Sequence, residues 1–541
     1  MGSCVVSMNH QEPTRVLTNQ MAPLTTDVTV RPTEAEEEER NQEHIKTDHL
    51  LPNLKRLTLS GGAVTMSAQA AKFGLNLAST VILARLLTAR DFGLVAMVTT
   101  VTGFLLIFRH AGLSTPTVQR AHITHAQVSN LFWINLGVSG LCALALAALS
   151  PIIARFYHDS RITPIALVLS TTFLIGGFRV QHLALLKRQM RFKAIALIEV
   201  VSMATGVLVG IVMALLRYGY WALVGLSLAT EIAAFLLTGV VSRWRPQLPS
   251  RGSGIGPLLA FGAHQTAGSF IFGLARGCDN LLIGRFYGPV AVGLYSRGAA
   301  LVIRPMEQFL LPIDAVFLPT LSRLQSQPER YRSTFLRLYE TIAMSVFFFS
   351  SLLLALAMPV TLVLLGPRWH HVSAIFAGFT FTAIQLPLST AANWLLTSQG
   401  RGKDIFRVTS INALLTLASF IVGLPFGPLG VAIAFSATGL LVRLPILYYV
   451  AGRRGPVSTS DLWTRFLRHL PLWVLMFVAT WLMRTTVADL RPLTQLLICA
   501  PVGVLTGIAF ISMLKPQRKV ATQLLETVRE FKTRTGERNN G

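Results

Sequence analysis

The sequence predicts an all-α integral membrane protein of about 14 transmembrane helices, with two parallel-repeat six-helix lobes around a central cavity plus an extra helix pair. Composition is the first observation: of 541 residues, 52% are hydrophobic and 13% are charged, and the mean hydropathy is +0.55. Soluble domains carry about 25% charged residues, so lipid is the main solvent of this chain. Recurring apolar segments and a short duplicated motif are the second and third observations.

The N-terminal 56 residues differ in composition from the rest. They hold nine acidic and six basic residues and include the run EAEEEE, so we expect residues 1–56 to form a disordered acidic extension. A segment that docks a partner is the alternative. The extension lacks the basic start and apolar centre of a secretory signal. With 24 acids and 48 bases in the whole chain, the remainder carries 15 acids and 42 bases, a net charge of +27.

Apolar segments follow along the rest of the chain, each about as long as a bilayer-spanning helix of about 20 residues. We expect fourteen, near 62–84, 92–110, 131–154, 163–184, 194–216, 219–241, 256–281, 290–316, 341–365, 372–397, 409–425, 428–449, 470–484 and 493–514. The first, seventh and eighth are the least apolar.

The basic residues between these segments predict the topology. Thirty Lys and Arg residues fall in alternate loops and both flanks, against nine in the opposite loops. Because Lys and Arg resist translocation, the rich side is expected to be cytoplasmic, with both termini inside a multi-pass protein of the inner membrane. Arg109 and His110 are interpreted as marking a cytoplasmic helix end. The predicted divisions are 57–250 and 251–450 for the lobes, 451–516 for the extra pair and 517–541 for a basic cytoplasmic tail.

A short motif is written twice. ILARLLTARDFGLVAM starts at Ile82 and LIGRFYGPVAVGLYSR at Leu282, so Arg85 and Arg285, Gly93 and Gly293, and Leu94 and Leu294 correspond. Both copies follow an odd-numbered helix, the first and the seventh, so the halves have the same orientation. Coincidence in a Leu- and Gly-rich chain is the alternative. Duplication of a six-helix unit predicts two lobes with a cleft between them, as in transporters whose halves rock around a substrate.

The eighth helix carries unusual charge for a membrane segment. Arg297 and Arg304 are seven residues apart, as are Glu307 and Asp314, so each pair repeats after about two turns. A charged side chain in a span costs at least a few kcal/mol unless a cavity or partner receives it. We expect this flank to line the cavity and its arginines to meet an anion such as phosphate. An internal ion-pair ladder from Arg304 to Glu307 is the alternative.

Other ionisable residues lie in the remaining spans. Lys72 and Arg276 are further candidate cavity cations, although Arg276 could simply pair with Asp279 three residues on. Glu199 and Glu231 stand alone in otherwise apolar segments. Each carboxylate either exchanges a proton to couple transport to an ion gradient or pairs with an arginine of a neighbouring helix.

Missing motifs argue against an enzyme. The chain has no P-loop, no DxD pair and no loop long enough for a soluble catalytic domain. Its four cysteines, at 4, 142, 278 and 499, are far apart and are expected to be unpaired. We expect no cofactor, no metal and no nucleic-acid partner.

Several segments resemble Wzx-type polysaccharide flippases, and most closely the exopolysaccharide exporters of that group. They are LASTVILARLLTARDFGLVAM, TPTVQR at 115–120, YGYWALVG at 218–225, DNLLIGRFYGPVAVGLYSR at 279–297 and GLPFGPLGVAIAFS at 423–436. The resemblance covers about residues 55 to 515. This group belongs to the superfamily of multidrug extruders and lipid II flippases. Its members commonly carry an acid near the position of His110, where this chain reads HAGLS, so no role of that acid is carried over.

The resemblance implies a function for the fold. It implies transport of an undecaprenyl-diphosphate-linked oligosaccharide from the cytoplasmic to the outer leaflet, for exopolysaccharide or lipopolysaccharide synthesis. The expected partners are this lipid-linked oligosaccharide, the bilayer and other polysaccharide assembly proteins. One alternative is the same fold exporting lipid II or a drug. The other is a scaffold that transports nothing and docks an assembly complex through the acidic extension.

Overall fold

The computed structural model describes residues 45, 52, 54–109, 114–120, 122–251, 254–514, 517–518, 520 and 522. Within these, the side chains of 54–56, 59, 257 and 260–276 are not described. The acidic extension and the basic tail therefore lie almost wholly outside the described residues. The described part consists of helices without any strand, and ten of its helical segments are long and apolar enough to cross a membrane. This confirms the predicted all-α membrane fold.

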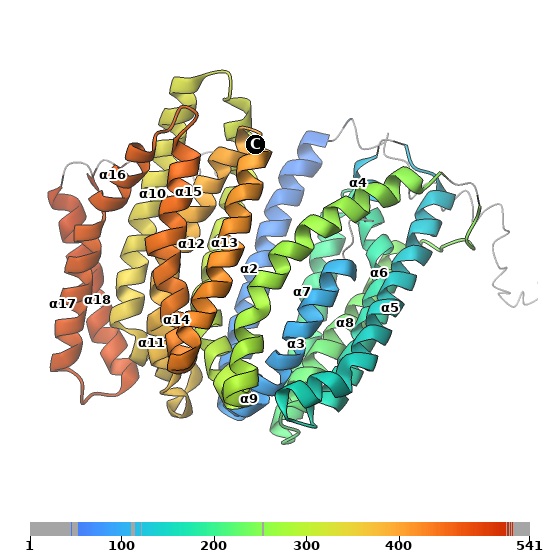
Figure 1. Cartoon of the computed structure of the whole chain (residues 1–541), viewed down its shortest axis with the longest axis horizontal. Helices are drawn as coiled ribbons and strands as arrows, with labels where there is room; N and C mark the ends of the chain where they lie inside the picture. The colour runs from blue at the N-terminus through green and yellow to red at the C-terminus, as the bar shows by residue number, and fades with distance from the viewer. Residues whose placement is uncertain are drawn as a thin grey trace, which may run out of the picture.

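The first helices form an N-terminal bundle, drawn from blue to green in Figure 1. Its members are α2 (Leu54–Leu86), α3 (Ala89–Arg109), α4 (Ser114–Gln119), α5 (His125–Tyr157), α6 (Ile162–Arg188), α7 (Phe192–Leu215) and α8 (Trp221–Ser242). Antiparallel neighbours joined by short turns pack on each other, α5 on α6 and α7 on α8, while α2 packs on α7. Thr124 and Gln127 form a reciprocal capping box that starts α5.

The element α9 (Gly256–Arg323) consists of two helical arms that meet at a kink, and it covers the predicted seventh and eighth spans. It breaks at Gly288, whose φ of 77° is open to glycine at little cost, and Pro289 follows directly. We call residues 256–287 the first arm and 289–323 the second arm. The first arm crosses in front of the N-terminal bundle in Figure 1, and the second arm turns back towards the C-terminal helices.

The C-terminal helices occupy the other side of the molecule (Figure 1). They are α10 (Pro328–Ala355), α11 (Ala357–Leu365), α12 (Val372–Ser398), α13 (Gly402–Gly423), α14 (Gly427–Thr438), α15 (Leu444–Gly452), α16 (Thr459–Arg468), α17 (Leu470–Thr486) and α18 (Pro492–Met513). A π-helical turn, Gly439–Arg443, joins α14 to α15. Every predicted span falls on helical segments: 341–365 covers the end of α10 and α11, 428–449 covers α14, the π-helical turn and α15, and the others each fall on one helix or one arm of α9. The long helical elements α2 and α9 are not among the ten apolar segments counted above, and they carry the three spans predicted to be least apolar.

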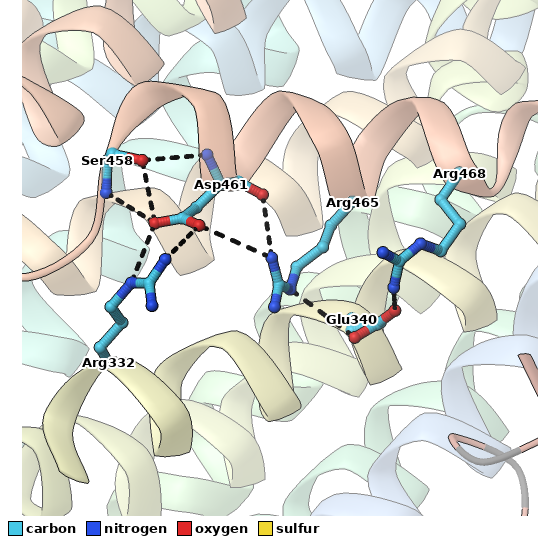
Figure 2. Close-up of polar contacts among 6 residues, drawn as sticks. All are labelled: Arg332, Glu340, Ser458, Asp461, Arg465 and Arg468. Atoms are coloured by element: carbon cyan, nitrogen blue, oxygen red, sulfur yellow. Dashed lines mark hydrogen bonds and ion pairs between the residues drawn. The ribbon is translucent and has the colours of Figure 1, made fainter. Parts of the chain in front are cut away.

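The extra helix pair α17–α18 is preceded by α16, a short amphipathic helix that the sequence analysis did not include. Figure 2 shows how α16 is held on α10: Arg332 donates to Asp461 at 2.7 Å and 3.1 Å, and Arg465 lies 3.6 Å from Glu340. Arg468 also donates to Glu340, at 2.5 Å. Because the carboxylates are only 13% exposed, these ion pairs are less screened than surface pairs. We call these ion pairs between α10 and α16 the carboxylate ladder. They fix the start of the extra helix pair to the C-terminal bundle.

Candidate functional site

The two copies of the duplicated motif pack directly on each other. A Cβ atom on Gly93 would lie 1.7 Å from the carbonyl oxygen of Pro289, and one on Gly293 would lie 1.8 Å from that of Ala89. Residues 89 and 289 correspond in the duplication, so the contact is reciprocal: each glycine meets the partner copy's carbonyl. Only glycine permits so close an approach of α3 to the second arm. The repeated motif thus builds a two-fold contact between the halves.

The repeated arginines flank this contact on opposite halves. Arg85, at the end of α2, donates to the carbonyl of Val363 in α11 at 2.8 Å. Arg285, at the end of the first arm, lies 3.5 Å from His158 in the turn after α5. Trp369 adds a buried hydrogen bond of 2.7 Å to the carbonyl of Ala84. Each copy of the motif therefore reaches the turn region of the other half.

The turn after α5 carries its own ion pair. Arg161 donates to Asp159 at 2.6 Å and 2.9 Å, and this hydrogen bonding holds the pKa of the Asp159 carboxyl below its ordinary value. The carboxylate therefore stays charged at neutral pH, next to the histidine that faces Arg285.

An apolar core continues across the contact. Leu94 and Met97 of α3 are fully buried with Ile283 and Val292 of α9. The two halves are therefore in close apolar contact where the glycines meet. We call this contact, made by Gly93, Gly293 and the buried side chains around them, the seal.

The second arm leads from this seal along its charged flank. The Arg297 guanidinium lies 4.7 Å from the centre of the Phe92 ring, a cation–π contact, and its buried Nε has no hydrogen-bond partner in the described part of the chain. Arg304, two turns further, is exposed and makes no ion pair with any described residue. The Arg304–Glu307 ladder offered as the alternative is therefore not formed. Asp314 accepts a hydrogen bond of 2.6 Å from the Trp394 indole.

The described residues include a hydrogen-bond partner for Asp279, the acid expected to pair with Arg276. Asp279 accepts a hydrogen bond of 3.0 Å from the Tyr295 hydroxyl, which joins the first arm to the second. The backbone of Arg276 is helical, but its side chain is outside the described residues.

Lys72 and Glu199, the single charged residues of the predicted spans 62–84 and 194–216, contact each other. Their ammonium and carboxylate are 2.6 Å apart and join α2 to α7, with 24% and 33% of the side chains exposed. Lys72 is thus part of an ion pair of the N-terminal bundle.

Glu231 lies between two arginines from different helices. Its carboxylate oxygens are 3.8 Å from Arg109 and 3.6 Å from Arg179. Arg109 is the last residue of α3, which agrees with its expected place at a helix end, but it is only 8% exposed and is therefore also a buried member of this cluster. Gly176 makes room for it, because a Cβ there would lie 2.2 Å from the guanidinium. A charged residue at a helix end gives no sequence signal of this inward turn.

Arg443 is a second buried cation that the sequence analysis missed. It lies at the end of the π-helical turn, donates to Thr416 at 2.9 Å and to the carbonyl of Phe435 at 2.7 Å, and lies over the Phe435 ring at 4.3 Å. These contacts hold its two terminal nitrogens within the C-terminal bundle, while its buried Nε has no hydrogen-bond partner in the described part of the chain. The described residues contain no group of three or more potential metal ligands.

Comparison with known proteins agrees with the resemblance seen in the sequence segments. The model of a family described as polysaccharide biosynthesis protein matches residues 82–374, more than half of the chain. The lipopolysaccharide biosynthesis protein WzxC of Escherichia coli is 23% identical over 79% of this chain and 88% of its own length. The succinoglycan biosynthesis transport protein ExoT of Rhizobium meliloti is 26% identical over 69% of this chain and 75% of its own.

Solved structures share the fold at lower identity. The lipid II flippase MurJ, in an inward closed conformation, aligns with 84% of this chain and 98% of its own, with a TM-score of 0.67 and 13% identity. An inward-facing multidrug transporter of the MATE family aligns with a TM-score of 0.55 and 15% identity over 74% of this chain and 99% of its own. The chain therefore shares its fold with these two solved structures. Through the family match, the chain belongs to the polysaccharide biosynthesis protein family.

Proposed function

We propose that this protein is a flippase that carries an undecaprenyl-diphosphate-linked oligosaccharide across the inner membrane by alternating access. The observation that carries the proposal is the reciprocal glycine contact, in which each half closes on the other at one end of the bundle. A two-fold seal built from short, complementary contacts can open as a unit when two rigid halves rock. The relatives' roles in lipopolysaccharide and succinoglycan synthesis support polysaccharide as the cargo class.

The orientation follows from the distribution of basic loops. The seal lies at the end where the loops are poor in Lys and Arg, while α4 and α16 lie at the opposite end, with the basic loops (Figure 1). We assign the basic end to the cytoplasm, with both termini on that side. The structure then corresponds to a state that is closed towards the outside.

The headgroup contact is assigned to the second arm. Arg304 is exposed and unpaired among the described residues, and Arg297 lies two turns nearer the seal with a buried, unsatisfied Nε. A diphosphate presents several acceptor oxygens to such donors. Arg276 remains a candidate for the same role. Lys72 and the carboxylates of Glu199, Asp279, Glu307 and Asp314 are assigned to holding the helices, with ion coupling by Glu199 or Glu231 a further prediction.

Export of surface polysaccharide by living cells tests the proposal. A strain that lacks the protein is complemented with the native chain or with Arg297→Gln/Arg304→Gln, and membrane protein levels are compared. We expect the double variant to lose at least nine-tenths of polymer output, on the order of the tenfold change that 1.4 kcal/mol gives, while undecaprenyl-linked units accumulate inside.

Two outcomes would contradict the proposal. Full export by the double variant would show that these arginines do not contact the anion of the cargo. Normal polymer in the deletion strain would exclude polysaccharide as the cargo and favour lipid II or another substrate.

A further inference from the structure

A pocket of about 300 Å³ lies in the N-terminal bundle, away from the second arm of α9. It is formed where α3 ends and where α4 packs on α6, at the end of the molecule opposite the seal (Figure 1). Its polar lining comes from three cations, Arg109, Arg179 and Lys187, and from three uncharged residues, Ser114, Thr115 and Gln119. None of the residues proposed above for the headgroup contact is among its described lining.

The described lining of this pocket is strongly basic. Three cations line it, and Glu231 is the carboxylate that approaches two of them, at 3.8 Å from Arg109 and 3.6 Å from Arg179. One carboxylate against three cations leaves the group with excess positive charge. Such an excess is stable only if water or an anion receives it.

The cations also have unused hydrogen-bond donors. Both contacts of Glu231 are longer than hydrogen bonds, and the buried Glu231 Oε2 and Arg109 Nε have no hydrogen-bond partner in the described part of the chain. Arg179 donates no hydrogen bond to a described residue, and neither does Lys187, which is exposed. Arg109 itself is held by a hydrogen bond of 3.3 Å to the carbonyl of Thr172 and by the Phe173 ring, 5.9 Å away. The pocket thus keeps unused donors next to one loosely bound carboxylate.

Part of the lining is apolar. Val118, Val180 and Leu183 share the wall with the cations, and Val118 is 37% exposed. The site combines hydrogen-bond donors that suit phosphate with an apolar wall at a membrane edge. It therefore fits an amphipathic ligand better than a free inorganic ion.

We propose that this pocket binds the phosphate groups of a lipid headgroup, and that its ligand is the diphosphate of the lipid-linked cargo before it enters between the halves. The identity of the cargo rests on the proposed function. A diphosphate esterified at both ends carries one negative charge on each phosphate, which matches the excess charge of three cations over one carboxylate. Forked donors such as Arg179 bind such oxygens in pairs. The second arm would then receive a headgroup already extracted from the leaflet.

Binding to the purified full-length protein tests this site. Undecaprenyl diphosphate and phosphatidylglycerol are the two probes, each titrated in detergent and followed by native mass spectrometry. The variant is Arg179→Gln/Lys187→Gln. The matched control is Lys193→Gln, a lysine of α7 that is not among the described lining residues. We expect at least tenfold weaker binding of undecaprenyl diphosphate to the variant, and native affinity in the control.

The two lipids separate the possible sources of the phosphate. Phosphatidylglycerol that binds as tightly as undecaprenyl diphosphate and displaces it would overturn the assignment to cargo. Unchanged affinity of the double variant for both probes would overturn the site itself. Lys187→Gln alone, at an exposed residue, covers the case in which loss of Arg179 disturbs the fold, and we expect it to weaken binding as well.

The result is distinguishable from the test of the proposed function. If the deletion strain exports polymer normally but the pocket variant still loses diphosphate binding, the proposed function fails and the phosphate site stands. If Arg297→Gln/Arg304→Gln abolishes export while the pocket variant binds both lipids as the native chain does, the site fails alone.

Discussion

At the scale of residues, the sequence located most of the charges in the membrane but not their partners. Lys72 and Glu199 were separately expected to line a cavity or couple an ion, and they meet at 2.6 Å across 127 positions of chain. No spacing rule links residues so far apart, because their contact depends on how α2 packs on α7. The burial of the Arg109 side chain was not predicted for the same reason: it depends on the packing of α6, where Gly176 leaves room for the guanidinium.

The Lys72–Glu199 pair gives a test that separates structural pairing from ion coupling. Glu199→Gln leaves an unpaired ammonium and Lys72→Met an unpaired carboxylate, so we expect each to lower the thermal midpoint, with a cost of about 1–3 kcal/mol. The double variant Lys72→Met/Glu199→Gln should lose less than the sum of the single variants, because no charge is left without a partner.

Polysaccharide export by the same variants completes this test. Pairing predicts that the double variant exports polymer close to the native level. An inactive but stable double variant would show instead that Glu199 itself takes part in transport, as a proton carrier would.

At the scale of elements, apolar length was sufficient to locate the spans, but a short amphipathic helix was not predicted. The spans near 256–281 and 290–316 are the two arms of α9, which meet at a kink because Gly288 leaves the helical conformation and Pro289 follows it. Helix α16 escaped notice because its 10 residues are too short and too charged for a span. Its carboxylate ladder to α10 depends on tertiary packing, which the periodicity of the chain does not encode (Figure 2).

The close approach of α3 to the second arm predicts sharply different effects for two glycines of one helix. Gly93→Ala places a methyl group 1.7 Å from a backbone carbonyl, so the helices must separate, and we expect a loss of about 1–3 kcal/mol and reduced export. At Gly103 no described atom lies within 4 Å of the added methyl group. Gly103→Ala should therefore be neutral or slightly stabilising, since alanine favours helix by up to about 1 kcal/mol.

Thermal midpoints of the two purified variants and their export in cells check this prediction. Gly293→Ala should behave like Gly93→Ala, because its methyl group would meet the carbonyl of Ala89 at 1.8 Å. If Gly93→Ala matched Gly103→Ala in both measurements, the reciprocal contact would have no part in closing the halves.

At the scale of the whole molecule, the duplication seen in the sequence explains the arrangement of the halves. A 200-residue offset relates Gly93 to Gly293 and Arg85 to Arg285, and the contacts obey the same offset, with residue 93 on the carbonyl of 289 and residue 293 on that of 89. The sequence therefore contained the symmetry of the seal. It did not reveal that the two copies touch, because identical motifs at equivalent positions could equally have faced lipid on opposite sides.

A seal that must open in every cycle can be locked from outside. Arg85 reaches the carbonyl of Val363 at 2.8 Å, so thiols at these two positions lie within about the length of an arginine side chain. In a background with all four native cysteines replaced, we expect a short bis-maleimide to join α2 to α11 in Arg85→Cys/Val363→Cys and to stop export. Each single-cysteine variant, which adds a thiol without a bridge, should continue to export in the presence of the reagent. Undiminished export by fully cross-linked protein would mean that α2 and α11 do not separate during transport, and alternating access through this end of the molecule would have to be abandoned.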